Sequence, residues 1–151
     1  MKQPKILIVD DSNVMCQFLA LYLSNKYETT ACTDSLEALQ MVKDGARFDL
    51  IVTDLNMPKL NGEQLIQSIH SFHPNVPILV VSASKESRQK LQALKAGAGD
   101  FLAKPFHPGE LDWRIGKLLT KPVKEKTARW WEFWHTGRTH TAATTAAVEY
   151  Q

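Results

Sequence analysis

The sequence lacks several features that would mark particular classes of protein. It has only two cysteines, Cys16 and Cys32, which are too few for a disulfide framework and lack metal-ligand spacing, so free thiols in a reducing cytoplasm are expected. No apolar run approaches the ~20 residues of a membrane span, and the N-terminus lacks the long apolar region of a signal peptide. The formal net charge of +2 lacks the clear excess of basic residues that is typical of DNA-binding proteins. We therefore expect a cytoplasmic protein that binds neither DNA nor membrane.

The composition is that of an ordinary globular chain. Hydrophobic residues make up 44% of the 151 residues, which is too many for a disordered protein, and the length suits about one domain. Five apolar runs predict buried strands: Lys5–Val9, Glu28–Cys32, Leu50–Thr53, Pro77–Val81 and Asp100–Ala103. The second run alternates more than the others, which indicates a strand nearer the edge of a sheet.

Helical patterns separate these runs. The residues expected to open the helices are Ser12, Asp34, Asn61, Ser84 and Pro108, and Gly97 is placed to close the fourth helix. The apolar side of the first helix is expected to carry Val14, Phe18, Leu21 and Tyr22, and that of the fourth Leu91 and Leu94. Alternating strands and helices predict a doubly wound five-stranded parallel sheet with helices on both faces, in the α/β class.

Ligands of such sheets bind at the carboxyl ends of the strands, so the residues that follow each strand are candidates for a site. They are Asp10, Asp11, Asp54, Ser82 and Lys104. Three carboxylates held close together repel one another, and a cation that neutralises them would keep such a cluster in place. Because only oxygen ligands are on offer, the cation that suits them best is Mg²⁺.

These positions, with the segments ILIVDDS, DLIVTDLNMPKLNG and GAGDFLAKPF, resemble the receiver domain of response regulators in bacterial two-component systems. The resemblance implies a flavodoxin-like (βα)5 fold over residues 1–120. It implies that Asp54 accepts a phosphoryl group from a histidine kinase or a phosphotransfer protein. Asp11, Asp54 and the backbone carbonyl of Asn56 would bind Mg²⁺ directly, and Asp10 mostly through water.

The resemblance also implies roles for the remaining site residues. Lys104 would contact the bound phosphoryl group after a cis Lys104–Pro105 peptide bond, and Ser82 would donate a hydrogen bond to it. Ser82 and Phe101 would form the switch, in which the ring turns inward on phosphorylation and reshapes the face of helix 4, strand 5 and helix 5. Serine and phenylalanine stand where threonine and tyrosine are more frequent, so Phe101 lacks a hydroxyl that could bond to a partner.

The output is expected to be a protein contact with an unknown downstream protein, as in single-domain chemotaxis-type or phosphorelay-type members. The chain beyond Leu119 is too short for an ordinary second domain. Pairs of Lys90 with Glu110 and of Asp100 with Arg114 suggest a phosphorylation-favoured homodimer through helix 4, strand 5 and helix 5, although solvated surface charges are an equal alternative. The tail, residues 121–151, has an aromatic segment at 127–135 that could contact its own receiver, a partner or, least readily, a membrane; the remainder is expected to be disordered.

Two other functions stay open at this point. A phosphohydrolase that works through an aspartyl phosphate would place a second Asp two residues after the nucleophile as acid and base, but Asn56 stands there. A phosphorylation-independent adaptor would not need all five site positions. We therefore expect a protein that catalyses only its own phosphorylation and dephosphorylation.

Overall fold

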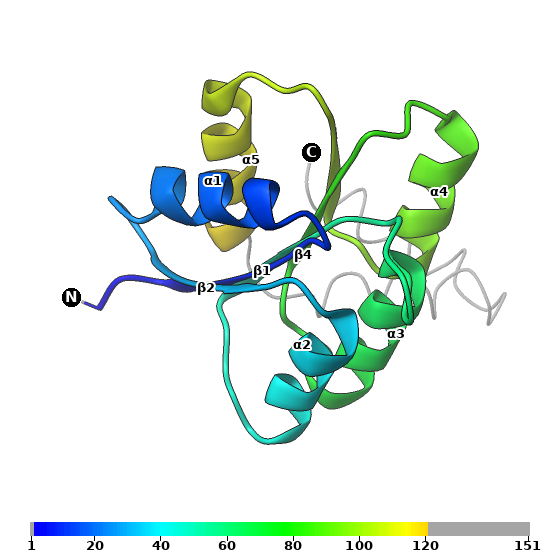
Figure 1. Cartoon of the computed structure of the whole chain (residues 1–151), viewed down its shortest axis with the longest axis horizontal. Coiled ribbons are helices and arrows are strands. Elements are labelled where there is room, and N and C mark those ends of the chain that lie inside the picture. Colours follow the sequence, from blue (N-terminus) through cyan, green and yellow to red (C-terminus); the bar gives the residue numbers. More distant parts are fainter. Residues whose placement is uncertain (1, 121–151) are drawn as a thin grey trace, which may run out of the picture. The chain divides into compact units, whose positions relative to one another are not determined.

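The structure, a computed structural model, describes residues 2–120. A single parallel sheet with the strand order β2-β1-β3-β4-β5 forms its centre (Figure 1). The strands are β1 (Lys5–Val9), β2 (Glu28–Cys32), β3 (Leu50–Thr53), β4 (Ile78–Ser82) and β5 (Asp100–Ala103). The helices are α1 (Asn13–Leu23), α2 (Ser35–Lys43), α3 (Gly62–Phe72), α4 (Ser87–Ala96) and α5 (Pro108–Thr120). The predicted α/β class and parallel, doubly wound sheet are confirmed.

The burial of each strand follows its place in the sheet. β3 and β4 are buried along their whole lengths and β1 after its first residue, whereas β2 pairs only with β1 and exposes most of its side chains. β4 begins one residue later than predicted. Pro77 has no N–H to donate, and it contributes only its carbonyl, which accepts a hydrogen bond from Ile51 N at 3.0 Å.

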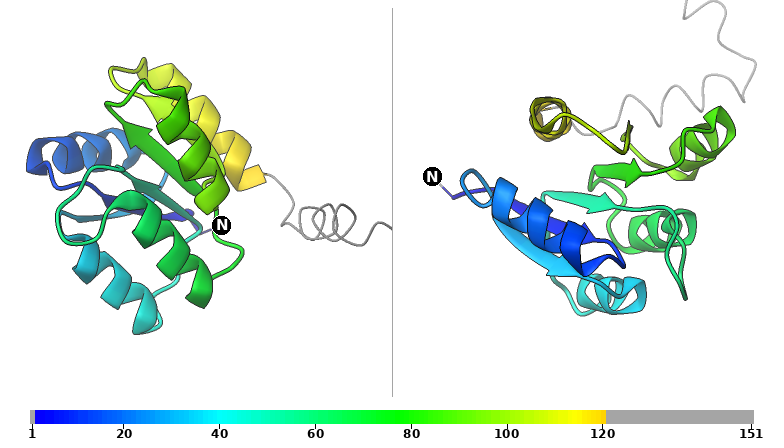
Figure 2. Two further views of the ribbon diagram at one scale, coloured as in Figure 1. Left: turned by 90° about the vertical axis from the view of Figure 1, so that its right-hand side faces the viewer. Right: turned by 45° about the horizontal axis from the view of Figure 1, so that its top comes forward.

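The helices cover both faces of the sheet (Figure 2). The core on one face includes side chains of α1 and α5, and the core on the other includes side chains of α2, α3 and α4. No helix within residues 2–120 has the length and apolarity that crossing a bilayer requires.

Most of the predicted helix ends are confirmed. Ser12, Asp34 and Asn61 each accept a hydrogen bond from a backbone N–H of the first turn that follows, and Gly97 ends α4 with a φ of +124°. Ser84 does not open a helix. It lies in the loop after β4, and α4 begins at Ser87 with Glu86 at its N-cap.

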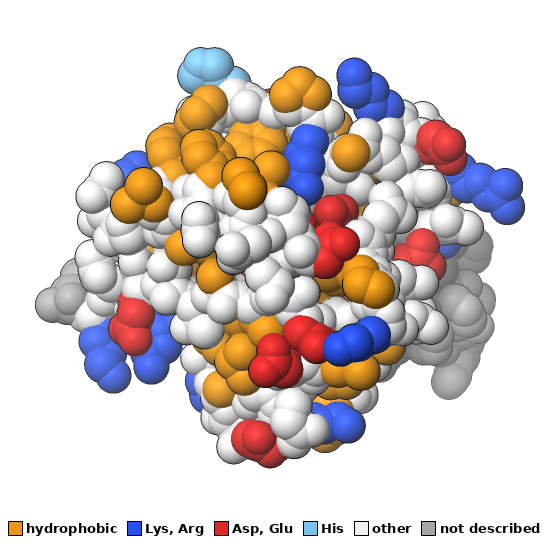
Figure 3. Space-filling view, in the orientation of Figure 1, with side chains coloured by type: hydrophobic (Ala, Val, Ile, Leu, Met, Phe, Trp, Pro, Cys, Tyr) orange, Lys and Arg blue, Asp and Glu red, His pale blue; other side chains and the backbone are white. Residues whose placement is uncertain are grey.

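The apolar sides of α1 and α4 are not the ones expected from the pattern. α1 packs Cys16, Leu19 and Leu23 against the sheet and leaves Val14 and Leu21 77% exposed. α4 likewise buries Ala93 and exposes both of its leucines. Hydrophobic side chains accordingly gather on the surface over α1 and α5 (Figure 3). α1 has no charged residue, so its pattern does not mark one side as the buried one.

Candidate functional site

The carboxyl ends of β1, β3 and β5 bring the predicted site together. Asp54 follows β3, where its backbone N–H donates to Val9 O at 3.1 Å, and Lys104 follows β5, where its N–H donates to Ser82 O at 2.8 Å. Carboxylate oxygens of Asp10, Asp11 and Asp54 all lie within 4.8 Å of one another. The predicted convergence of the three carboxylates is therefore present in the fold.

Lys104 enters the same cluster. Its Nζ lies 3.0 Å from Asp10 Oδ2 and 3.4 Å from Asp54 Oδ2, and the predicted cis Lys104–Pro105 peptide bond is confirmed. Burial lowers the pKa of the Lys104 ammonium, but the two carboxylates outweigh that effect and the net pKa is raised. Lys104 is therefore protonated at neutral pH.

Backbone groups orient two of the carboxylates. Asp10 Oδ1 accepts the N–H of Ser12, the residue that caps α1, at 2.9 Å. Asp54 Oδ1 accepts the N–H groups of Leu55 at 2.6 Å and Asn56 at 3.4 Å. Only 4% of the Asp10 side chain and 12% of the Asp54 side chain are exposed, whereas Asp11 is exposed. This cluster of three carboxylates, which we call the acidic pocket, is therefore buried at Asp10 and open to water at Asp11.

The donor set of this pocket fits a divalent cation. Three carboxylates with one ammonium leave two negative charges unbalanced, and all the candidate ligand atoms are hard oxygens. Residues Asp10, Asp11 and Asp54 are placed to hold such an ion. The role of the Asn56 carbonyl stays a prediction.

The two predicted switch residues lie on neighbouring strands. Ser82 ends β4 and is fully buried, and its hydroxyl accepts the N–H of Ser84 at 3.4 Å. Phe101, in β5, is only 6% exposed and packs in the core on the α2–α4 face. This structure therefore contains the inward position of the ring, and a movement between two positions stays a proposal.

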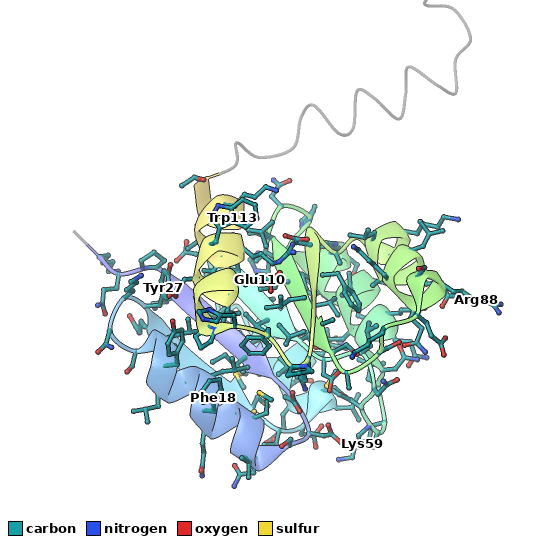
Figure 4. All side chains as sticks on the ribbon, turned by 90° about the horizontal axis from the view of Figure 1, so that it is seen from above. Phe18, Tyr27, Lys59, Arg88, Glu110 and Trp113 are labelled. Carbon is teal, nitrogen blue, oxygen red and sulfur yellow. The ribbon has the colours of Figure 1, made fainter. Side chains whose placement is uncertain are left out.

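Three of the four charges proposed to pair across a dimer, Asp100, Glu110 and Arg114, are paired within the chain. Both Nη1 hydrogen bonds of Arg114 go to the carboxylate of Asp100, at 2.8 and 2.9 Å, and Nη2 lies 3.0 Å from Glu110. Lys90 forms no ion pair within residues 2–120. Figure 4 shows Glu110 and Trp113 projecting from α5.

The resemblance already placed Met57, Pro58 and Gly62 in the loop between β3 and α3, and the structure has Met57 and Pro58 there and Gly62 as the first residue of α3. A Cβ atom at Gly62 would overlap the carbonyl oxygen of Asp54 and lie 2.7 Å from Leu55 Cα, so this position accommodates no side chain without a shift of the backbone.

Sequence reasoning missed the contacts that hold the loop tip, in which Ser35 bonds Pro58 and Leu60 and Asp34 pairs with Lys59. Asp34 was identified only as the expected cap of α2.

In this fold, three carboxylates and a lysine converge at one edge of a parallel sheet. Residues 6–116 match the family model described as the response regulator receiver domain. The chain belongs to this family, whose members are phospho-acceptors in two-component signal transduction.

Individual comparisons agree. The chain is 40% identical over 121 residues to the response regulator MprA of Mycobacterium leprae, covering 78% of this chain and 53% of MprA. The receiver domain of the Francisella response regulator 1452 is 34% identical, with a TM-score of 0.71 over 78% of this chain and 97% of that one. The receiver domain of the Pseudomonas aeruginosa sensor histidine kinase PA1611, solved with a magnesium ion in its active-site cleft, is 27% identical, with a TM-score of 0.72 over 79% of this chain and 99% of that one.

The curated relatives are longer than the matched region. The chain spans from 8% to 54% of their length, and they include sensor histidine kinases as well as response regulators. The shared part is the receiver domain, which in this family accepts phosphoryl groups from histidine kinases or phosphotransfer proteins.

Proposed function

We propose that Asp54 is the phosphoacceptor of this receiver domain. The observation that supports this role is the placement of its carboxylate, which is slightly exposed, lies beside the Lys104 ammonium, and belongs to the only three-carboxylate cluster found within residues 2–120. An oxygen of Asp54 attacks the phosphorus of a phosphohistidine, a P–O bond forms, and the P–N bond breaks with its electron pair left on the imidazole. The product is an aspartyl phosphate.

The other residues act mainly by position and charge. Asp11, Asp54 and the carbonyl of Asn56 would hold Mg²⁺, with Asp10 bonded mostly through water; the PA1611 receiver domain, which binds magnesium, supports this assignment. The bound ion would neutralise negative charge between the carboxylates and the phosphoryl oxygens. The Lys104 ammonium contacts a phosphoryl oxygen, and the hydroxyl of Ser82 donates a hydrogen bond to another.

We expect the protein to accept a phosphoryl group without acting as a turnover enzyme. Asn56 occupies the position at which an aspartyl-phosphate phosphohydrolase would need a carboxylic acid, and an amide neither gives up nor takes a proton at neutral pH. No observation favours a phosphorylation-independent adaptor. The free thiols of Cys16 and Cys32 support a cytoplasmic location.

The test is incubation with acetyl phosphate and Mg²⁺, followed by intact mass measurement. The wild type should gain one phosphoryl group only when Mg²⁺ is present, and Asp54→Asn should gain none. Asp44→Asn is the matched control, because Asp44 is an exposed aspartate at the C-cap of α2 and should not affect the adduct. An adduct on Asp54→Asn would contradict the assignment of the acceptor. Absence of an adduct from the wild type, with a suitable kinase as well, would favour the adaptor.

The output of phosphorylation is proposed to run through Ser82 and Phe101 to the face formed by α4, β5 and α5. Movement of the Ser82 hydroxyl toward the phosphoryl group would change the space beside Phe101, whose ring lies inward here. Ser82→Ala should still form the adduct but lose the spectral response of this face, recorded as amide chemical shifts of α4 and β5. Equal shifts in the wild type and Ser82→Ala would contradict the switch.

A homodimer through the same face and a downstream protein partner are further proposals. The exposed leucines of α4, Leu91 and Leu94, favour a contact at this face. Arg114 would have to exchange its bonds to Asp100 within the chain for bonds across the dimer. Sedimentation of the phosphorylated chain tests this, with Leu91→Lys expected to keep it monomeric. Residues 121–151, including the aromatic segment at 127–135, lie outside the described residues.

A further inference from the structure

The loop between β3 and α3 contains a turn that is unusual for an L-amino acid. Lys59 has a φ of +69°, the only positive φ of a non-glycine residue within residues 2–120. The N–H of Leu60 donates to the carbonyl of Pro58 at 2.9 Å, which closes a γ-turn around Lys59. γ-turns with a positive central φ are rare and strained, and such conformations persist where neighbouring groups hold them.

One neighbouring group is the hydroxyl of Ser35, the first residue of α2. It donates to the carbonyl of Pro58 at 3.3 Å and accepts the N–H of Leu60 at 3.2 Å, so both polar groups of the turn bind the same side chain. Ser35 is only 2% exposed, which shields these bonds from water. A short hydroxyl that both donates and accepts fits the two groups of this turn.

The second neighbouring group is the carboxylate of Asp34. Its Oδ2 lies 2.6 Å from the Nζ of Lys59, while its Oδ1 accepts the N–H of Leu36 and so caps α2. The bond to Lys59 lowers the pKa of Asp34, and the bond to Asp34 raises the pKa of Lys59. Both charges are therefore present over the whole neutral range. Figure 4 shows Lys59 at the periphery of the domain.

The remaining anchors of this loop lie at its two ends. At the start, the N–H of Asp54 donates to Val9 O, and at the close, the N–H of Gly62 donates to Leu55 O at 2.8 Å. The bonds to α2 hold the tip that lies between these anchors. Asn56, the predicted ligand through its carbonyl, lies in the same short loop.

We propose that Asp34, Ser35 and Lys59 form a clamp through which the start of α2 positions the β3–α3 loop and sets the affinity of the acidic pocket for a divalent cation. The three are positioning residues: they act through the loop backbone and lie outside the metal-binding set. The clamp rests on the proposed function, because it tunes the metal site on which phosphorylation depends. Groups that orient metal ligands from outside the coordination shell commonly change metal affinity by about 10- to 100-fold.

The experiment is calorimetric titration of the full chain with Mg²⁺, alongside hydrogen exchange of the backbone amides of residues 55–57, 59 and 60 in the metal-free protein. Ser35→Ala should raise the Kd for Mg²⁺ about tenfold and speed exchange in the loop. Lys59→Met should raise the Kd about threefold, because an exposed ion pair contributes less, and Lys59→Arg should restore it. Ser24→Ala and Glu28→Gln are the controls, since among the described residues the Ser24 hydroxyl bonds only the end of α1 and the Glu28 carboxylate pairs only with Lys5.

Lys59→Gly separates positioning from stability. Glycine adopts a positive φ without strain, so this variant should unfold at the same or a higher temperature than the wild type, yet bind Mg²⁺ more weakly and exchange faster in the loop. If the clamp were merely structural, Lys59→Gly would lower the Mg²⁺ affinity only where it also lowered the unfolding temperature.

The outcomes distinguish the two proposals. If the wild type binds Mg²⁺ and forms the phosphoryl adduct but the clamp variants bind as tightly as the wild type, the clamp is overturned and the proposed function stands. Equal weakening in the controls also overturns the clamp. A wild type that binds no Mg²⁺ and forms no adduct overturns both.

Discussion

β5 has a charged cluster at each of its ends, and the two clusters are built differently. After its last residue, Lys104 meets carboxylates that outnumber it, which leaves the pocket with unbalanced negative charge. At its first residue, Arg114 binds Asp100 through two short hydrogen bonds and also pairs with Glu110, whose side chain is 44% exposed. The single excess negative charge of this structural cluster therefore stays in contact with water. The acidic pocket keeps two excess charges, partly on buried side chains, and a bound cation would neutralise them.

Replacing the positively charged side chain should have the largest effect on stability, and the size of that effect should differ between the two clusters. Lys104→Met should destabilise the metal-free protein by about 3 kcal/mol, because it leaves the buried Asp10 unpaired beside two other carboxylates. Arg114→Met should cost about 1 kcal/mol, since its partners keep more contact with water. Urea unfolding in EDTA measures both. Added Mg²⁺ should reduce the loss of unfolding free energy in Lys104→Met but not in Arg114→Met. An equal response of the two variants to Mg²⁺ would contradict the difference between the clusters.

Two glycines, Gly62 beside the acidic pocket and Gly116 in the helix that carries Arg114, should respond with opposite signs. Gly62→Ala should destabilise by about 2 kcal/mol, because the new Cβ overlaps backbone atoms at the end of β3. Gly116→Ala in α5 meets no atom within 4 Å and should stabilise by about 0.5 to 1 kcal/mol. Thermal unfolding checks both, and a stable Gly62→Ala protein would show that the loop can move away from β3.

Neutralising one carboxylate should change the stability of the protein in opposite directions in the two clusters. Asp54→Asn should stabilise the metal-free protein by about 1 kcal/mol, because it relieves repulsion among three acids. Asp100→Asn should destabilise by about 1 kcal/mol, because it removes the partner of Arg114. Denaturation in EDTA at neutral pH measures both values. Destabilisation by Asp54→Asn would mean that the N–H groups of Leu55 and Asn56 and the Lys104 ammonium already balance its charge.

The smallest expected effect concerns the two thiols. Burial raises the pKa of Cys16 and of Cys32 above the ordinary 9.0, so each thiol binds its proton more tightly in the folded chain than in the unfolded one. Their contribution to stability is complete below pH 9.0 and is lost as the pH rises through the raised values. Cys32→Ala should therefore flatten the fall in stability between pH 8 and pH 10, by roughly a few tenths of a kcal/mol. If Cys32→Ala left the pH dependence of stability unchanged, the raised pKa of Cys32 would be contradicted.

Much of the fold was predictable because its signals are local. Continuous β-branched runs mark strands buried on both faces, and Ser12, Asp34 and Asn61 bond to backbone groups only two or three residues away. The convergence of Asp10, Asp54 and Lys104 was predictable as well, because parallel strands align their carboxyl ends at one edge. The start of α4 was not predictable, because Glu86 makes no side-chain cap that a sequence pattern could indicate.

The sequence by itself determined the order of the elements, the parallel sheet and the set of charged residues at its edge, since each depends on short-range pattern and on strand direction. Only the tertiary structure decided which side of α1 faces the sheet, because an uncharged helix with apolar residues all round has no polar side to exclude. It also decided that Asp34 and Ser35, at the start of α2, bond the tip of the β3–α3 loop. These contacts join segments more than 20 residues apart in the sequence, and no local pattern indicates a hydrogen bond over that separation.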